Sequence, residues 1–125
     1  MKISMSSFLA LALVAALPVT AAGTDQAAFN NHCRTCHSLK EGDNRLGASL
    51  AGIVGAKAGT RPGFAGYSQA MKSASITWDE QTLDRFIANP DEVVPNNNMK
   101  PFKGVPDAEV RKKIVAALKS GSGSG

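Results

Sequence analysis

The residues with the clearest chemistry lie in one short run, Cys33-Arg34-Thr35-Cys36-His37. In this C-x-x-C-H spacing, two thiols on one turn of chain can each form a thioether bond to a vinyl group of haem. The histidine that follows can then bind the haem iron from one side. The motif predicts one covalently attached haem c, with Cys33 and Cys36 as the attachment residues and His37 as an axial ligand.

Three other interpretations of the two cysteines stay open. A C-x-x-C pair is also the motif of thiol–disulfide oxidoreductases, but this pair follows a predicted helix and no βαβ pattern surrounds it. Zinc could bind the cysteines together with His32 and His37, but both histidines lie too close to the cysteines for a zinc finger. A Cys33–Cys36 disulfide would close a very small loop and add little stability.

If haem is attached, the second axial ligand can be found by elimination. His32 adjoins Cys33 and cannot easily reach the opposite face of the ring, so two methionines remain, Met71 and Met99. Met71 lies in a predicted helix, where core packing explains it. Met99 follows His37 by 62 positions, in a loop without apolar periodicity, and we predict it as the other axial ligand. A His/Met pair fills both axial positions and favours electron transfer over catalysis.

The first residues predict export. Lys2 precedes ten apolar residues, 8–17, and small residues then run to Ala22. These are the parts of a secretory signal peptide. A membrane anchor is the alternative, but a spanning helix needs roughly 20 apolar residues. We expect residues 1–22 to be removed, the chain to reach a bacterial periplasm, residues 23–119 to form the domain, and residues 120–125 to be a flexible Ser/Gly tail.

Composition limits the remaining possibilities. A chain of 125 residues allows one domain, and 43% hydrophobic with 19% charged residues fits a globular protein. The net charge of +4 is too small and too dispersed for a nucleic-acid-binding protein. Two cysteines exclude a scaffold built on several disulfides.

Periodicity and capping residues predict an all-α fold of four or five short helices. We expect helices over 25–33 (capped by Thr24 or Asp25), over 69–74 (capped by Ser68), from a Thr77–Glu80 capping box to near Asn89, and from Pro106 to about 119, with a short turn over 91–94. The Gly-rich stretch 38–66 is unusually long for a loop of a small domain. Long loops of this kind need an internal support, and one haem would supply it.

The order of these landmarks resembles the class I cytochromes c, small soluble proteins with one haem. The similarity covers about residues 25–119 and rests on Phe29, the C-x-x-C-H motif, Leu50-Ala51-Gly52, Gly59, Pro62-Gly63-Phe64, Tyr67, Ile76-Thr77-Trp78, Thr82-Leu83, Asn89-Pro90, Pro95 and Met99. The resemblance implies an all-α globule wrapped round the haem, with crossing N- and C-terminal helices.

The resemblance also implies donors to a buried haem propionate. Trp78 would donate through its indole N–H and Tyr67 through its phenol, with Asn97 as a weaker candidate. A buried carboxylate needs such donors, and both rings would also form apolar wall. Plain core packing is the alternative for Trp78 and Tyr67.

Several positions depart from the family pattern. Ala48 stands where a proline usually supports the axial histidine, although the carbonyl of Gly47 or Ala48 could still orient its ring. Ala56 replaces an arginine near the propionates, with Arg61 as a candidate substitute. Phe86 replaces a tyrosine whose hydroxyl would contact the methionine sulfur.

The resulting hypothesis is a monomeric periplasmic one-electron carrier, not an enzyme, that docks transiently with redox partner proteins at the haem edge. Asp91 and Glu92 stand where the mitochondrial family has lysines, so steering of acidic partners would be weak. The remaining basic residues are Arg34, Lys40, Lys57, Lys100 and Lys103. The alternatives are a haem sensor or enzyme with a displaceable sixth ligand and, more remotely, a haem-free dithiol oxidoreductase.

Overall fold

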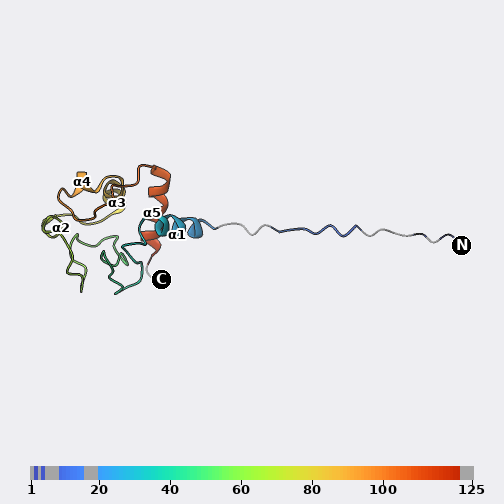
Figure 1. Cartoon of the computed structure of the whole chain (residues 1–125), viewed down its shortest axis with the longest axis horizontal. Coiled ribbons are helices and arrows are strands. Elements are labelled where there is room, and N and C mark those ends of the chain that lie inside the picture. The colour runs from blue at the N-terminus through green and yellow to red at the C-terminus, as the bar shows by residue number, and fades with distance from the viewer. Residues whose placement is uncertain (1, 3, 5–8, 16–19, 122–125) are drawn as a thin grey trace.

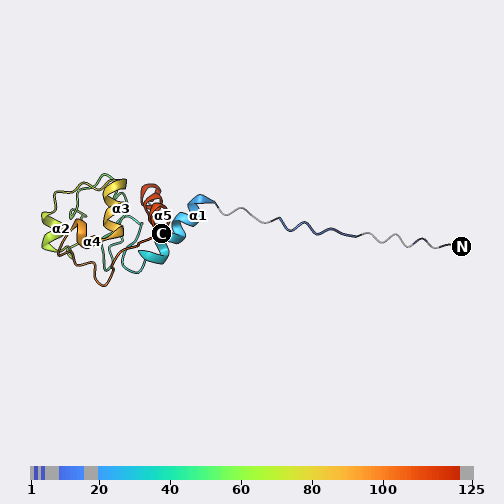
Figure 2. The same cartoon turned by 90° about the horizontal axis from the view of Figure 1, so that it is seen from above.

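The computed structural model describes residues 2, 4, 9–15 and 20–121, and within these ranges it contains five helices and no strand. The helices are α1 (Ala21–His32), α2 (Gln69–Ser73), α3 (Glu80–Ala88), α4 (Pro90–Val93) and α5 (Ala108–Ser120). Residues 9–15 form no helix and extend away from the helical part in both views (Figures 1 and 2). Among the described helices, none is long and apolar enough to cross a bilayer. The predicted signal peptide and Ser/Gly tail fall partly outside the described residues.

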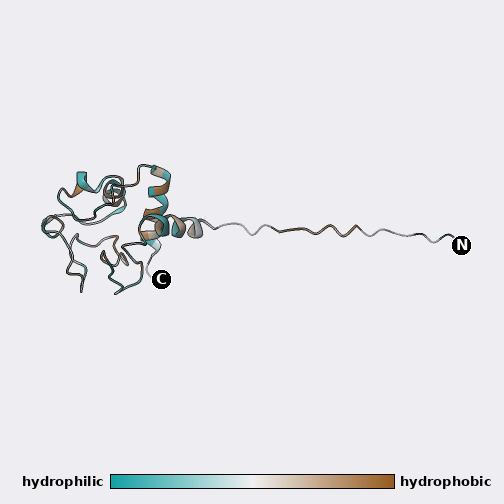
Figure 3. Ribbon diagram, viewed as in Figure 1, coloured by the Kyte–Doolittle hydropathy of each residue, from teal (hydrophilic) through white to brown (hydrophobic). Residues whose placement is uncertain are grey.

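Helices α1 and α5 pack against each other at one end of the molecule, although they come from opposite ends of the domain sequence (Figures 1 and 2). Phe29 of α1 and Ile114 of α5 are among the most deeply buried side chains. Apolar and polar residues alternate along α5 (Figure 3), and its buried face carries Ile114, Val115, Ala117 and Leu118. This periodicity explains why α5 lies on the core along one side only. The all-α fold and the packed terminal helices agree with the prediction.

The start of α3 corrects one sequence expectation. The capping box is formed by Asp79 and Thr82 and not by Thr77 and Glu80. The Thr82 backbone N–H donates to Asp79 Oδ1 at 2.7 Å, and the Asp79 N–H donates to Thr82 Oγ1 at 2.8 Å. Thr77 is unavailable because it is extended in an isolated antiparallel bridge with Lys57. The predicted end of this helix, before Pro90, is confirmed.

The other boundaries differ by a few residues. Helix α1 begins at Ala21 instead of residue 25, because the Thr20 hydroxyl caps it by accepting from the Gly23 N–H at 3.2 Å. Thr24 does not cap; its hydroxyl donates to the Ala21 carbonyl at 2.9 Å. Helix α2 has the predicted Ser68 cap. Helix α5 starts two residues after Pro106, behind an Asp107 cap.

The loops are tied to the helices by backbone pairing. The Ala58 N–H donates to the Ile76 carbonyl at 2.8 Å, and the Trp78 N–H donates to the Ala56 carbonyl at 2.9 Å. These bonds join the long loop after α1 to the segment that leads into α3. The loop that follows α4 returns at Gly104, where φ is +111° and an added Cβ would lie 2.1 Å from the Ala88 carbonyl oxygen. Both loops therefore follow defined paths over the core.

The Asp79 cap gives a test of the α3 boundary. We expect Asp79→Ala to lower the thermal midpoint by roughly a few degrees, because an N-cap is lost. Hydrogen bonds from the Thr82 backbone N–H, and secondly its hydroxyl, hold the pKa of Asp79 below its usual value. The charge-dependent stabilisation is therefore present above the unfolded pKa, about 3.9, and disappears as pH falls through the lower folded pKa.

The measurement is thermal unfolding at several pH values, with Gln81→Ala as the control on the same exposed turn. Equal midpoints for Asp79→Ala and the control at neutral pH would contradict the assignment of Asp79 as the cap.

Candidate functional site

The C-x-x-C-H motif forms a turn that continues directly from α1. The Cys33 N–H donates to the Phe29 carbonyl at 2.8 Å and so closes the helix. The N–H groups of Cys36 and His37 then both donate to the Cys33 carbonyl, at 3.1 and 2.9 Å. Both cysteines are free thiols, Cys33 half-buried and Cys36 exposed. Because one turn carries all three residues, the haem-attachment motif is compact and anchored to a packed helix.

The environment of Cys33 argues against a redox-active dithiol. Burial, together with the nearby Cys36, raises the pKa of the Cys33 thiol to about 12. Thiol–disulfide oxidoreductases need the opposite, a thiol whose pKa is lowered by cationic groups or a helix N-terminus. Here the pair follows the C-terminal end of α1, where the helix dipole does not favour a thiolate.

His37 is prepared as a metal ligand. Its Nδ1 lies 2.7 Å from the Ala48 carbonyl oxygen, and since a carbonyl only accepts, Nδ1 carries the hydrogen. Nε2 is thereby left as the lone-pair nitrogen that a metal would bind. Burial lowers the pKa of His37, while the Ala48 bond opposes that shift. The ring is therefore neutral near pH 7, and the carbonyl of Ala48 orients it although the family's proline is missing.

Gly47 makes this orientation of the ring possible. Its N–H donates to the Cys36 carbonyl at 2.7 Å, so the loop lies directly against the motif. A Cβ at this position would lie 2.2 Å from His37 Cε1 and 2.6 Å from Nδ1. Only glycine leaves room for the imidazole here.

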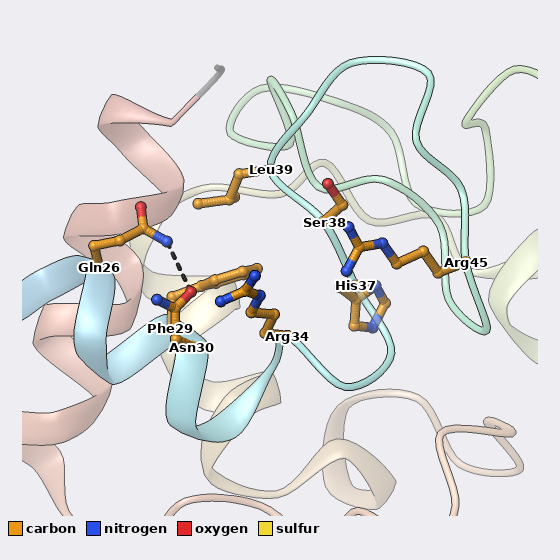
Figure 4. Close-up of a pocket in the computed structure, with 8 residues that line it drawn as sticks. All are labelled: Gln26, Phe29, Asn30, Arg34, His37, Ser38, Leu39 and Arg45. Carbon is orange, nitrogen blue, oxygen red and sulfur yellow. Dashed lines mark hydrogen bonds between the residues drawn. The ribbon is translucent and has the colours of Figure 1, made fainter. Parts of the chain in front are cut away.

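A cavity of about 140 Å³ lies beside His37 (Figure 4). It is lined by Gln26, Phe29, Asn30, Arg34, His37, Ser38, Leu39 and Arg45. Ligand sites usually measure about 300–1,000 Å³, so this cavity is too small to hold a haem. Arg45 forms an ion pair with Asp43 at 2.9 Å, and Gln26 Nε2 donates to Asn30 Oδ1 at 3.0 Å. The cavity therefore belongs to the surroundings of His37.

Met99 lies half-buried on a loop that is held from α4. The Met99 N–H donates to Asn97 Oδ1 at 3.0 Å. The Asn97 amide nitrogen donates in turn to Asp91 Oδ1 and to the Val94 carbonyl, each at 2.9 Å. Asp91 also forms an ion pair with Lys100, and the hydrogen bond from Lys100 lowers the pKa of Asp91. Asp91 therefore binds residues on both sides of Met99.

The side chain of Asn97 belongs to this network. The Asn97 side chain is buried, and both of its amide hydrogens have partners within the loop. Asn97 thereby positions Met99, and its bond to a haem propionate stays a prediction. Sequence reasoning missed the part played by Asp91, since only the folded loop brings Lys100, nine positions away, to the same carboxylate.

Tyr67 and Trp78 lie on segments that the bridge and turns bring together. The Tyr67 ring packs edge-on against Phe64, with 4.9 Å between centroids. Its hydroxyl oxygen accepts from the Arg61 backbone N–H at 3.2 Å, which leaves its own hydrogen for an acceptor. Trp78 is buried and packs at 5.0 Å against Phe86. Their apolar packing is observed, whereas the propionate role stays a prediction.

Two nitrogens of the half-buried Arg61 side chain have no protein partner. Arg61 Nε and Nη2 are buried and form no hydrogen bond within the described chain. Buried N–H donors of a cation favour a bound anion, and a haem propionate is an anion of the right kind. The chain therefore fits the predicted cofactor by two independent observations, the oriented His37 and the unpaired Arg61.

Comparison with known proteins gives relatives of one kind. No family model matches the chain. It is 42% identical over 88 residues to "Cytochrome c2 iso-2" of Magnetospirillum fulvum, covering 70% of this chain and 90% of the relative. It is 38% identical over 92 residues to "Cytochrome c" of Euglena viridis, covering 74% of this chain and 88% of the relative.

A solved structure agrees with the sequence relatives. Cytochrome cH from Methylobacterium extorquens matches with a TM-score of 0.71 and 37% identity, over 79% of this chain and 97% of that one. Cytochromes c carry one covalently attached haem c and transfer electrons without acting as enzymes. By relatives of this identity and coverage, by its fold and by its C-x-x-C-H turn, the chain belongs to the class I cytochrome c family.

Proposed function

We propose that this chain is an exported electron carrier whose haem iron is bound by His37 and Met99 and whose haem is attached through Cys33 and Cys36. The observation that carries the proposal is the His37–Ala48 hydrogen bond of 2.7 Å. It fixes a neutral, half-buried imidazole whose Nε2 carries the lone pair, as an iron ligand requires. The haem supplies an iron that accepts and returns one electron.

Met99 is the second ligand in this proposal. Its backbone is bonded to Asn97, and Asp91 holds Asn97 and Lys100 on either side of it. A restrained loop keeps the thioether in place and limits the rearrangement that accompanies a change of iron charge. With both axial positions filled by protein, no position is open to a substrate.

The second hypothesis is a haem sensor or enzyme with a displaceable sixth ligand. One observation favours it: Phe86 packs against Trp78 and has no hydroxyl with which to contact the Met99 sulfur. A methionine without that hydrogen bond would leave the iron more easily. The tether from Asp91 acts in the opposite direction, and we therefore place electron transfer first.

We also propose that export precedes function. Residues 1–22 would be removed as a signal peptide and residues 23–119 would form the domain in the periplasm. Cleavage after Ala22 removes the Thr20 cap together with the first two residues of α1. Thr24 or Asp25 would then be the first polar residue able to cap the shortened helix.

Partners would be donor and acceptor redox proteins that dock transiently at the haem edge of a monomer. Lys100 contributes less to such docking than the sequence alone implies, because Asp91 neutralises it. Lys57 and Lys103 remain basic on the loops. Electrostatic steering would therefore be weak, and the contact small and short-lived.

The ligand assignment is tested by Met99→Ala. We expect the oxidised variant to lose the weak far-red band of sulfur–iron ligation and the reduced variant to bind carbon monoxide nearly stoichiometrically. Its reduction potential falls, since axial ligands shift haem potentials over a range of about 0.8 V. Met71→Leu is the control, because Met71 is buried in the core and the exchange conserves volume.

The Met71 control should keep the wild-type spectrum and lose less than about 1.5 kcal/mol of stability. If the wild-type protein already binds carbon monoxide, the hypothesis of a haem sensor or enzyme replaces that of an electron carrier. A far-red band that survives in Met99→Ala and vanishes in Met71→Leu would transfer the ligand role to Met71.

Gly47→Ala tests the support of His37. The new Cβ would overlap the imidazole, so the Ala48 bond breaks and the ring turns. We expect less low-spin haem protein and a loss of roughly 1–3 kcal/mol in unfolding free energy, as overpacking produces. Leu46→Ala, one position earlier and 80% exposed, should match wild type in both measurements. Equal low-spin yields for the two variants would show that His37 does not depend on Gly47.

Export is tested by the mass of haem-containing protein recovered from the periplasm of a bacterium with cytochrome c maturation machinery. We expect a chain that begins at Gly23 and carries one haem. Full-length haem protein in the membrane fraction would instead support an uncleaved anchor.

A further inference from the structure

We propose that the guanidinium of Arg61 is the ionic partner of a haem propionate in this protein, in place of the arginine that Ala56 has replaced. The inference depends on the family's haem but not on the identity of the axial ligands.

The side chain of Arg61 carries a positive charge. Nε and Nη2 are the buried side-chain polar atoms without a hydrogen bond in the described chain. None of the ion pairs among the described residues involves Arg61. A guanidinium stays protonated in proteins, so burial cannot be relieved by losing the proton. The side chain as a whole is half-buried, and an acceptor from outside the polypeptide would satisfy the two buried nitrogens.

The backbone places Arg61 at a fixed point. Its N–H donates to the Tyr67 hydroxyl at 3.2 Å, and its carbonyl accepts from the Phe64 N–H at 3.4 Å. The next carbonyl, that of Pro62, accepts from Asn44 Nδ2 at 3.3 Å. The guanidinium thus extends from a closed turn and not from a free loop, and the same turn carries the phenol of Tyr67.

The segment before this turn connects it to Trp78. Lys57 pairs with Thr77, and the Ala56 carbonyl accepts the Trp78 N–H. Donors of three kinds, a guanidinium, a phenol and an indole, therefore belong to segments that are bonded together. Nε and Nη2 form the fork that binds a carboxylate through two parallel hydrogen bonds. The haem propionates are the carboxylates that the cofactor brings to this site.

Arg61 supplies the positive charge that the family usually has at position 56, where this chain has alanine. Alanine at position 56 lacks the long side chain of arginine. The hydrogen bond from the Trp78 N–H to the Ala56 carbonyl still holds the backbone at this position. Arg61, five positions later, supplies a cation from the other side of Gly59. The charge of the propionate is thereby balanced although the family's usual residue is absent.

The test uses complete haem-loaded protein and three variants. Arg61→Gln removes the charge, Arg61→Lys keeps it without the fork, and Lys57→Gln is the control that removes an exposed charge from the same loop. Removing a buried cation near the haem favours oxidised iron, so the potential of Arg61→Gln should fall. The shift should be several-fold larger than that of Lys57→Gln, whose charge is screened by water and salt. Arg61→Lys should lie between wild type and Arg61→Gln.

A direct measurement accompanies the potentials. In the reduced wild-type protein, we expect nuclear Overhauser contacts between the Arg61 Nε hydrogen and the methylene hydrogens of a haem propionate. This readout holds even if Arg61→Gln does not fold. The proposal is overturned if these contacts are missing, or if Arg61→Gln shifts the potential no more than Lys57→Gln does.

Failure here is distinguishable from failure of the proposed function. The far-red band reports Met99, whereas the Overhauser contacts report Arg61. A protein with that band but without the contacts would remain a carrier whose Arg61 has another partner.

Discussion

The hydrogen bond from His37 Nδ1 to the Ala48 carbonyl is the constraint on which the site depends. It fixes the tautomer, holds the half-buried ring in place and leaves Nε2 as the nitrogen able to bind a metal. Several separate features of the chain serve it. Helix α1 ends at Cys33 so that the next turn delivers His37, and Gly47 has no side chain where the ring must lie. Because a backbone carbonyl performs this role, alanine can stand at position 48, where the family usually has proline, and the bond is still formed.

Much of the fold follows from local rules that the sequence displays. The helices at Ser68 and before Pro90 were predicted from side chains that act within a few residues. The predicted capping residue of α3, Thr77, was wrong because Thr77 pairs instead with Lys57, twenty residues earlier in the chain. Local and long-range features differ in the same way within the site. The C-x-x-C-H run is local, and the sequence indicated that Cys33, Cys36 and His37 lie together directly after a helix.

Contacts between distant segments could not be predicted in the same way. The amide hydrogens of Asn97 bind Asp91 and Val94, and the resemblance alone suggested a propionate. Arg61 was a candidate by its charge, but only the folded turn shows that its Nε and Nη2 are buried without a partner in the described chain. Buried polar groups are where sequence patterns carry least information, because their partners are set by the tertiary structure.

The packing of α1 against α5 has a consequence for how the protein is made. The haem-attachment turn follows α1 directly, while α5, the helix that packs on α1, is the last of the five described helices in chain order. The attachment turn therefore precedes in the chain the helix that supports it. Attachment enzymes would meet Cys33 and Cys36 on an open segment, and closure of α5 over α1 would follow. An unfolded exported chain would thus keep the two cysteines accessible until α5 packs on α1.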